Sequence, residues 1–116
     1  MMINIKNKGK FIELNVKKTG KFERGIGLMF KSRMSENLVF DFNRNVGISI
    51  HSYFVFFPFL AIWLDEKNNL IESKIVRPFR FRVRPVKNFR RLVEVPINQE
   101  NTKILDFFVG NREKFK

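Results

Sequence analysis

The stretch SYFVFFPFLAIWLD, residues 52–65, decides what kind of fold this chain can adopt. It belongs to a longer run, from Asn45 to Leu64, that contains no Lys, Arg, Asp or Glu. A run of this length is long enough to be considered as a transmembrane helix. The alternative is that it forms the interior of a small globular protein, and the sequence has to decide between the two.

Three features of the run favour a protein interior. His51 and two serines interrupt it, its first residues alternate like a strand, and Pro58 would break a helix in the most apolar part. Phe, Val, Ile and Tyr are also the residue types that fill strands. We therefore predict buried strands that bend near Pro58 and are covered on both faces. One face would carry Phe54 and Phe56, and the other Val55, Phe57 and Phe59.

The composition is that of one small folded domain. The chain has 116 residues, 44% of them hydrophobic, and 15 Phe against one Trp and one Tyr. It has no Cys, which excludes disulfides, thiolate metal sites and Cys nucleophiles, and its single His leaves few ways to hold zinc. We therefore expect no metal and no cofactor. The lack of Cys, with no apolar leader before Lys6, favours the cytoplasm.

The pattern of apolar residues predicts a mostly β domain over 1–116. Short strands are predicted at Ile3–Lys6, Phe11–Val16, Leu38–Phe42, Phe59–Leu64, Leu70–Val76, Phe79–Arg84 and Leu92–Val95. One short helix is predicted from the spacing of Phe22, Ile26, Met29 and Phe30, and Asn98 can cap a second from Gln99 to Phe108. We expect about seven or eight strands in a small closed or partly open β-barrel, because closure removes the sheet edges.

Charge and the segment FRFRVR, residues 79–84, point to an anionic partner. Lys and Arg outnumber Asp and Glu by 23 to 11, a formal charge of +12. In a strand, Arg80, Arg82 and Arg84 would project from one face about 6.5–7 Å apart, and Phe79 and Phe81 would face inward. Arg77, Arg90 and Arg91 add to the cluster. Guanidinium groups suit phosphate oxygens, so nucleic acid or another polyanion is the expected partner.

Other interpretations of these residues stay open. The Arg row can be a solvated sheet face without a partner. A small-ligand or enzymatic site can form near Arg24, His51 and Pro58, although His51 and Ser52 cannot act together because neighbours in a strand point to opposite faces. A third possibility is a protein-interaction domain that uses an exposed Phe-rich patch. We identify no catalytic residue.

Five segments, in order, resemble the domain of unknown function 192 family. ERGIGLMF (23–30) resembles the family signature ER-x-x-GLMFR, and GISIHSYFVFFPFLAIWLD (47–65) is similar to its central segment as archaeal members have it. VRPFR (76–80) is similar to LKPWR, RRLVEVP (90–96) to a strand ending in ELP, and FVGNREKF (108–115) lies where the family has a Gly-Asp tail. The resemblance implies a compact, mostly β domain and no established activity.

The chain departs from the family pattern at three positions. Val55 replaces a usual Met, Leu60 replaces an Asp that follows the Pro and its apolar neighbour, and Asn111 replaces the Asp of the tail. If that Asp takes part in a family site, the resemblance implies that the site is altered or missing here.

Overall fold

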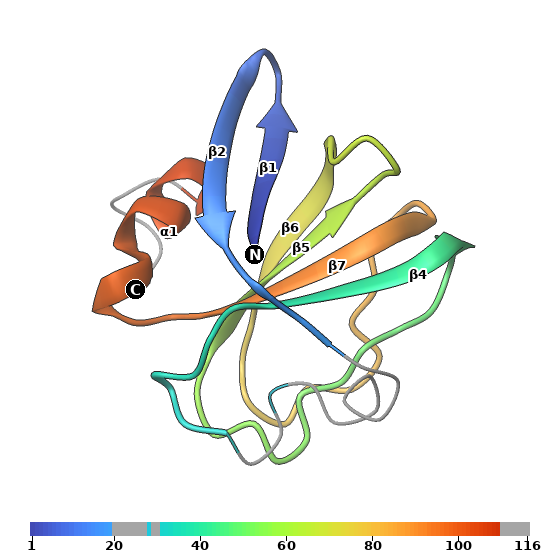
Figure 1. Cartoon of the computed structure of the whole chain (residues 1–116). Coiled ribbons are helices and arrows are strands. Elements are labelled where there is room, and N and C mark those ends of the chain that lie inside the picture. The colour runs from blue at the N-terminus through green and yellow to red at the C-terminus, as the bar shows by residue number, and fades with distance from the viewer. Residues whose placement is uncertain (20–27, 29–30, 110–116) are drawn as a thin grey trace.

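The computed structural model describes residues 1–19, 28 and 31–109. The regular structure of this part of the chain consists of a hairpin, a five-stranded sheet and a short helix that follows a 3₁₀ turn (Figure 1). The strands are β1 (Met2–Asn7), β2 (Lys10–Asn15), β3 (Lys17–Lys18), β4 (Leu38–Val46), β5 (Phe59–Leu64), β6 (Leu70–Val76) and β7 (Phe89–Pro96). A 3₁₀ turn, η2 (Gln99–Asn101), leads into the helix α1 (Thr102–Val109).

The five-stranded sheet has the order β3-β4-β7-β5-β6. Its neighbours pair antiparallel except for β3 and β4, which pair parallel. Strand β5 lies between β6 and β7, and every one of its six residues is buried. This is the strand that the sequence predicts at Phe59–Leu64, and β6 at Leu70–Val76 also has the predicted bounds.

The two faces of β5 belong to two different hydrophobic clusters. Leu60, Ile62 and Leu64 pack against the hairpin and α1. The alternate residues Phe59, Ala61 and Trp63 pack on the other face, under the loops that connect the strands. The part of the apolar run that forms β5 is therefore covered on both sides, as the sequence predicts. No helix among the described residues is long and apolar enough to cross a membrane.

The predicted barrel is wrong, because the strands form two separate sheets. The hairpin β1–β2 is joined to the large sheet beside β6 by a bridge between Lys6 and Asn69. It lies over one face of the large sheet next to α1 (Figure 1). The hairpin residues Ile3, Ile5 and Leu14 fill the cluster on that face, so the interior is closed by stacked elements and not by a continuous ring of strands.

The structure confirms the predicted helix near the C-terminus and its cap. The side chain of Asn98 accepts a hydrogen bond from the backbone N–H of Asn101 at 3.1 Å, which satisfies a free donor of the first turn. Ile104 and Leu105 are its buried residues. The helix predicted from Phe22, Ile26, Met29 and Phe30 lies outside the described residues.

Candidate functional site

Two long connections lie against each other on the face of the sheet opposite the hairpin. Residues 47–58 join β4 to β5, and residues 77–88 join β6 to β7. An isolated β-bridge pairs Ile50 with Val83 through two backbone hydrogen bonds of 2.7 and 2.8 Å. The two connections therefore form one surface, which we call the loop surface.

Ser52 fastens the two halves of the loop surface. Its side chain is fully buried, and its hydroxyl donates to the carbonyl of Arg77 and accepts from the backbone N–H of Arg80, both at 2.6 Å. Its backbone N–H donates to the carbonyl of Arg80, and its carbonyl accepts from the N–H of Phe79, both at 2.9 Å. Ser52 thus ties the basic loop to the other loop through both its side chain and its backbone.

The segment at 52–57 is not the buried strand that the sequence predicts. Val55 and Phe57 are buried, but Phe54 and Phe56 are 47% and 59% exposed. Phe54 also has a positive φ of 60°, which turns the chain and ends any strand alternation. The expectation that the face with Phe54 and Phe56 is covered fails here, because only one face of this segment meets the sheet.

The segment Phe79–Arg84 is also not a strand. Phe79 and Arg82 have positive φ values of 60° and 59°, and Val83 makes the only bridge in this segment. Phe79 and Phe81, expected to face inward, are 52% and 60% exposed. The predicted regular spacing of the Arg side chains along one strand face is therefore wrong.

The Arg residues of the predicted cluster divide into two groups. Arg77, Arg80, Arg82 and Arg84 are exposed on the loop surface. Arg90 and Arg91 lie on β7 and form ion pairs with Asp41, at 3.6 and 2.9 Å. Burial alone would raise the pKa of Asp41, but hydrogen bonds from the Asn43 backbone and from Arg91 hold that pKa below its usual value. These two Arg residues thus have a structural partner in the sheet.

Planar side chains on the loop surface lie against one another, with the His51 and Tyr53 rings tilted by 35° and the Tyr53 and Phe81 rings stacked. The ring centroids of His51 and Tyr53 are 5.4 Å apart, and those of Tyr53 and Phe81 are 5.7 Å apart with an interplanar angle of 26°. The guanidinium carbon of Arg82 lies 5.2 Å from the Phe81 ring centroid, within cation–π range. We call His51, Tyr53, Phe81 and Arg82 the planar row. Beside it, Phe56 and Phe79 form an edge-to-face pair at 5.6 Å.

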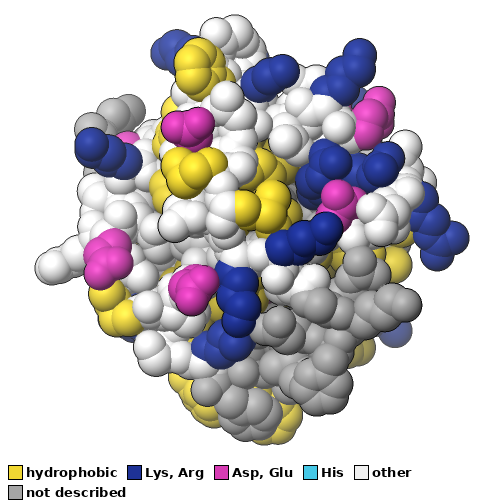
Figure 2. Space-filling model, viewed as in Figure 1, with side chains coloured by type: hydrophobic (Ala, Val, Ile, Leu, Met, Phe, Trp, Pro, Cys, Tyr) yellow, Lys and Arg dark blue, Asp and Glu magenta, His cyan; other side chains and the backbone are white. Residues whose placement is uncertain are grey.

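On the side of the molecule drawn in Figure 2, basic and acidic side chains are mixed. Figure 2 shows Lys and Arg side chains spread over the hairpin and the sheet edge, with acidic side chains among them. His, of which the chain has one, is not visible on that face.

The structure leaves the predicted small-ligand site near His51 untested. His51 is exposed, and its Nδ1 accepts from the backbone N–H of Tyr53 at 3.2 Å. Ser52 is buried while His51 is exposed, so the two side chains point apart as expected. Pro58 is half-buried, and Arg24 lies outside the described residues. This site stays a prediction.

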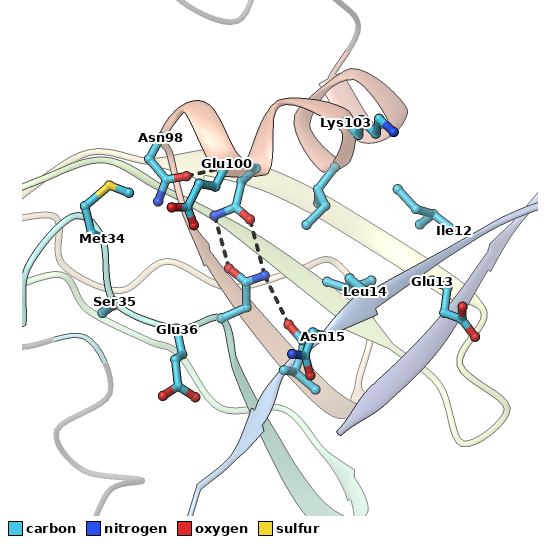
Figure 3. Close-up of a pocket in the computed structure, with 14 residues that line it drawn as sticks. Ile12, Glu13, Leu14, Asn15, Met34, Ser35, Glu36, Asn98, Glu100 and Lys103 are labelled. Carbon is cyan, nitrogen blue, oxygen red and sulfur yellow. Dashed lines mark hydrogen bonds between the residues drawn. The ribbon is translucent and has the colours of Figure 1, made fainter.

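A groove that the sequence did not indicate lies between β2 and α1 (Figure 3). Its volume is about 510 Å³. Asn37 and Asn101 meet in it through a reciprocal pair of amide hydrogen bonds of 3.3 and 3.1 Å. Their second donors bond to the carbonyls of Asn15 and Pro96. Because all four amide hydrogens are used within the protein, we interpret this amide pair as a structural tie.

Two of the departures from the family pattern lie in the core. Val55 and Leu60 are 2% and 0% exposed and belong to the two opposite hydrophobic clusters. At these positions the chain uses its side chains for packing. The third departure, Asn111, lies outside the described residues.

One buried acid remains on the sheet face that the loops cover. Glu94 on β7 is 6% exposed and pairs across the sheet with Leu38 and Ala61. Burial raises the pKa of Glu94 to about 8, because the ionised carboxylate loses its hydration. The burial of Glu94 is not indicated by the sequence, since a single Glu in a strand is ordinarily exposed.

The fold resembles two solved structures. One is a protein of unknown function from Novosphingobium aromaticivorans DSM 12444, with a TM-score of 0.71 at 11% identity over 89% of this chain and 76% of that one. The other is described as a candidate transcription regulator from Sinorhizobium meliloti 1021, with a TM-score of 0.70 at 17% identity over 88% of this chain and 81% of that one. At these identities the likeness shows the fold alone.

No curated protein matches the chain. The profile of one family, whose description is an uncharacterised ACR, matches residues 2–112 and so covers nearly the whole sequence. The mostly β fold and the family profile agree with the resemblance found in the sequence motifs. The chain belongs to the domain of unknown function 192 family.

Proposed function

We propose that this protein is a binding domain for nucleic acid and that the loop surface is its contact surface. The observation that carries the proposal is the placement of Arg80, Arg82 and Arg84. All three are exposed on one loop, and that loop is fastened beside exposed aromatic rings by Ser52. Basic side chains interleaved with aromatic rings are the groups by which proteins hold phosphates and bases together.

The basic side chains of the loop surface suit phosphate. Guanidinium groups donate in a planar fork that matches phosphate oxygens, and the +12 charge of the chain favours encounter with any polyanion. Because Ser52 already holds the backbone of the Arg loop in place, less conformational entropy is lost when a ligand binds. The description of one structural relative as a candidate transcription regulator is in keeping with such a partner. The cytoplasmic location expected from the sequence also agrees with a nucleic-acid partner.

The proposal is tested by removing the three Arg side chains together. The variant Arg80→Ala/Arg82→Ala/Arg84→Ala should bind an oligonucleotide more weakly, and the slope of log K against log salt should fall by about two to three. Fluorescence anisotropy titrations at several salt concentrations measure both.

The matched control removes three positive charges from the hairpin. Lys6→Ala/Lys8→Ala/Lys10→Ala changes the net charge equally, and all three Lys are exposed. It should lose much less affinity than the Arg variant. Equal losses would mean that net charge alone drives binding, and no binding at low salt would refute the proposal.

The exposed Phe rings also favour a second candidate, a protein-interaction surface. Phe56, Phe79 and Phe81 are each more than half exposed, which is unusual for rings clustered on a monomer. If copies of this chain associate through them, sedimentation should show a dimer that persists at high salt. A monomer at all salt concentrations would exclude self-association through this surface.

A further inference from the structure

We infer that the loop surface binds single-stranded nucleic acid by stacking unpaired bases on the planar row. This inference rests on the proposed function and specifies its ligand. The row consists of His51, Tyr53, Phe81 and the guanidinium of Arg82, at successive separations of 5.4, 5.7 and 5.2 Å. Bases stack on such rings whatever their sequence, because every base has a π face.

Within the described part of the chain, these rings belong to neither hydrophobic cluster. Phe81 is 60% exposed and Tyr53 39%, although the sheet beneath the loops has its own buried cluster. Leaving a phenyl ring in water forgoes the free energy that burial would give it. A cluster of such rings at the surface therefore points to something that covers it.

The backbone of the loop surface is strained at the same place. Phe79 and Arg82 both have φ near +60°, a region that bulky residues rarely adopt. Such conformations persist only where the surrounding structure imposes them, and they concentrate at binding sites. Here the hydrogen bonds of Ser52 and the bridge at Val83 impose the turn that brings Phe81 against Tyr53.

The geometry favours single strands over duplexes. In a duplex the base faces are covered by their neighbours, and reading the major groove takes a helix or a two-stranded ribbon. The connections 47–58 and 77–88 contain neither. They offer ring faces and guanidinium groups, which suit bases that are already unstacked.

The same geometry disfavours a lipid surface. A bilayer that buried Phe81 would also take in the guanidinium that lies over its ring. Burying a charge in hydrocarbon is costly, so this ring is poorly placed to insert. A nucleic-acid strand instead leaves the guanidinium next to a phosphate.

The chain provides one reporter in the site and one in the core. Tyr53 is its single Tyr and Trp63 its single Trp. Protein labelled with fluorotyrosine therefore gives one fluorine signal from the planar row, and protein labelled with fluorotryptophan gives one from the fully buried core. A short oligothymidylate should shift the Tyr53 signal, because the ring current of a stacked base acts on it. The Trp63 signal should stay in place.

An abasic oligomer with the same number of phosphates separates stacking from charge. The inference expects oligothymidylate to bind about fivefold to a hundredfold more tightly than the abasic oligomer, the range that one stacked base gives. Equal affinities for the two would overturn the inference and leave the proposed function standing. No binding of either would overturn both. Tighter binding of a duplex, or of vesicles containing phosphatidylglycerol, would also overturn the inference.

A variant pair tests the rings themselves. Tyr53→Leu/Phe81→Leu keeps apolar side chains but removes the flat faces, and it should abolish the advantage of oligothymidylate over the abasic oligomer. Phe11→Leu is the control, because Phe11 is 68% exposed on the hairpin, away from the two loops in Figure 1. The control should keep the full advantage. An unchanged core fluorotryptophan signal verifies that each variant is folded, and a preserved advantage in the ring variant would contradict the inference.

Discussion

At the scale of single residues, the exposure of Phe side chains separates two roles. Phe57, Phe59 and Phe89 are at most 3% exposed and fill the cluster beneath the loops. Phe56 and Phe81 are the same type of residue but lie at the surface. The sequence alone does not distinguish them, because exposure depends on which side of each loop meets the sheet. Positive φ values at Phe54, Phe79 and Arg82 interrupt strand geometry in both connections, and no residue pattern here indicates them.

Glu94 gives a prediction about stability and pH. Its pKa is raised to about 8 in the folded protein from a model-compound value of 4.5, so the folded state binds the proton more tightly than the unfolded state. The stabilising contribution is therefore complete at low pH and is lost as the pH rises from about 4.5 through about 8. Between those limits we expect a loss on the order of a few kcal/mol in the free energy of unfolding.

Urea denaturation across this pH range tests the Glu94 prediction. The variant Glu94→Gln has a neutral side chain of similar size, so its stability should vary much less with pH. Glu13→Gln is the control, because Glu13 is exposed and should leave the pH dependence of the wild type in place. Parallel pH profiles for wild type and Glu94→Gln would show that Glu94 is not the group responsible.

At the scale of elements, the sequence predicts the strands better than the connections. The strands β5 and β6 have the predicted bounds, and the helix with its Asn98 cap was also predicted. The residue patterns of these elements reflect which of their own side chains are buried. The alternation of residues 79–84 was equally regular but misleading, because a strand also needs a partner along its length and only Val83 makes a bridge there.

The sequence indicates the basic residues of the candidate site but not the aromatic residues beside them. The basic residues Arg80, Arg82 and Arg84 could be found from composition, and the structure does place them on one exposed loop. The aromatic rings beside them could not be found in this way. The contact between Tyr53 and Phe81 joins two separate connections, which the hydrogen bonds of Ser52 hold together. A serine in an apolar run gives no sign of its partner in the other loop.

Ser52 gives a prediction about the loop surface as a unit. Ser52→Ala removes the hydroxyl that bonds to the carbonyl of Arg77 and the N–H of Arg80, and leaves both without that partner. We expect a loss of about 1–3 kcal/mol in stability. Nucleic-acid affinity should also fall, because the Arg loop is then held only by backbone hydrogen bonds.

The neighbouring Ser49 supplies the control for that change. Ser49 is exposed in the same connection, so Ser49→Ala should leave both stability and affinity unchanged. Thermal unfolding and anisotropy titrations of the two variants provide the comparison. If Ser52→Ala were as stable as the wild type and bound as well, the fastening role assigned to Ser52 would be wrong.

At the scale of the whole molecule, the two faces of the large sheet have different tasks. One face is covered by regular elements, the hairpin and α1, and forms a compact cluster around Leu60, Ile62 and Leu64. The other face is covered by connections, and these carry exposed rings and guanidinium groups. A rigid scaffold that presents loops is the usual arrangement for a binding surface. The predicted barrel would have lacked this division.

The map of backbone amide NMR shifts upon addition of oligothymidylate tests the central claim most directly. We predict that the shifted amides lie in residues 48–57 and 77–84, on both sides of Ser52, and that the hairpin and the groove beside α1 stay unshifted. Shifts concentrated on the hairpin lysines or in that groove, with the two loops unchanged, would contradict the account.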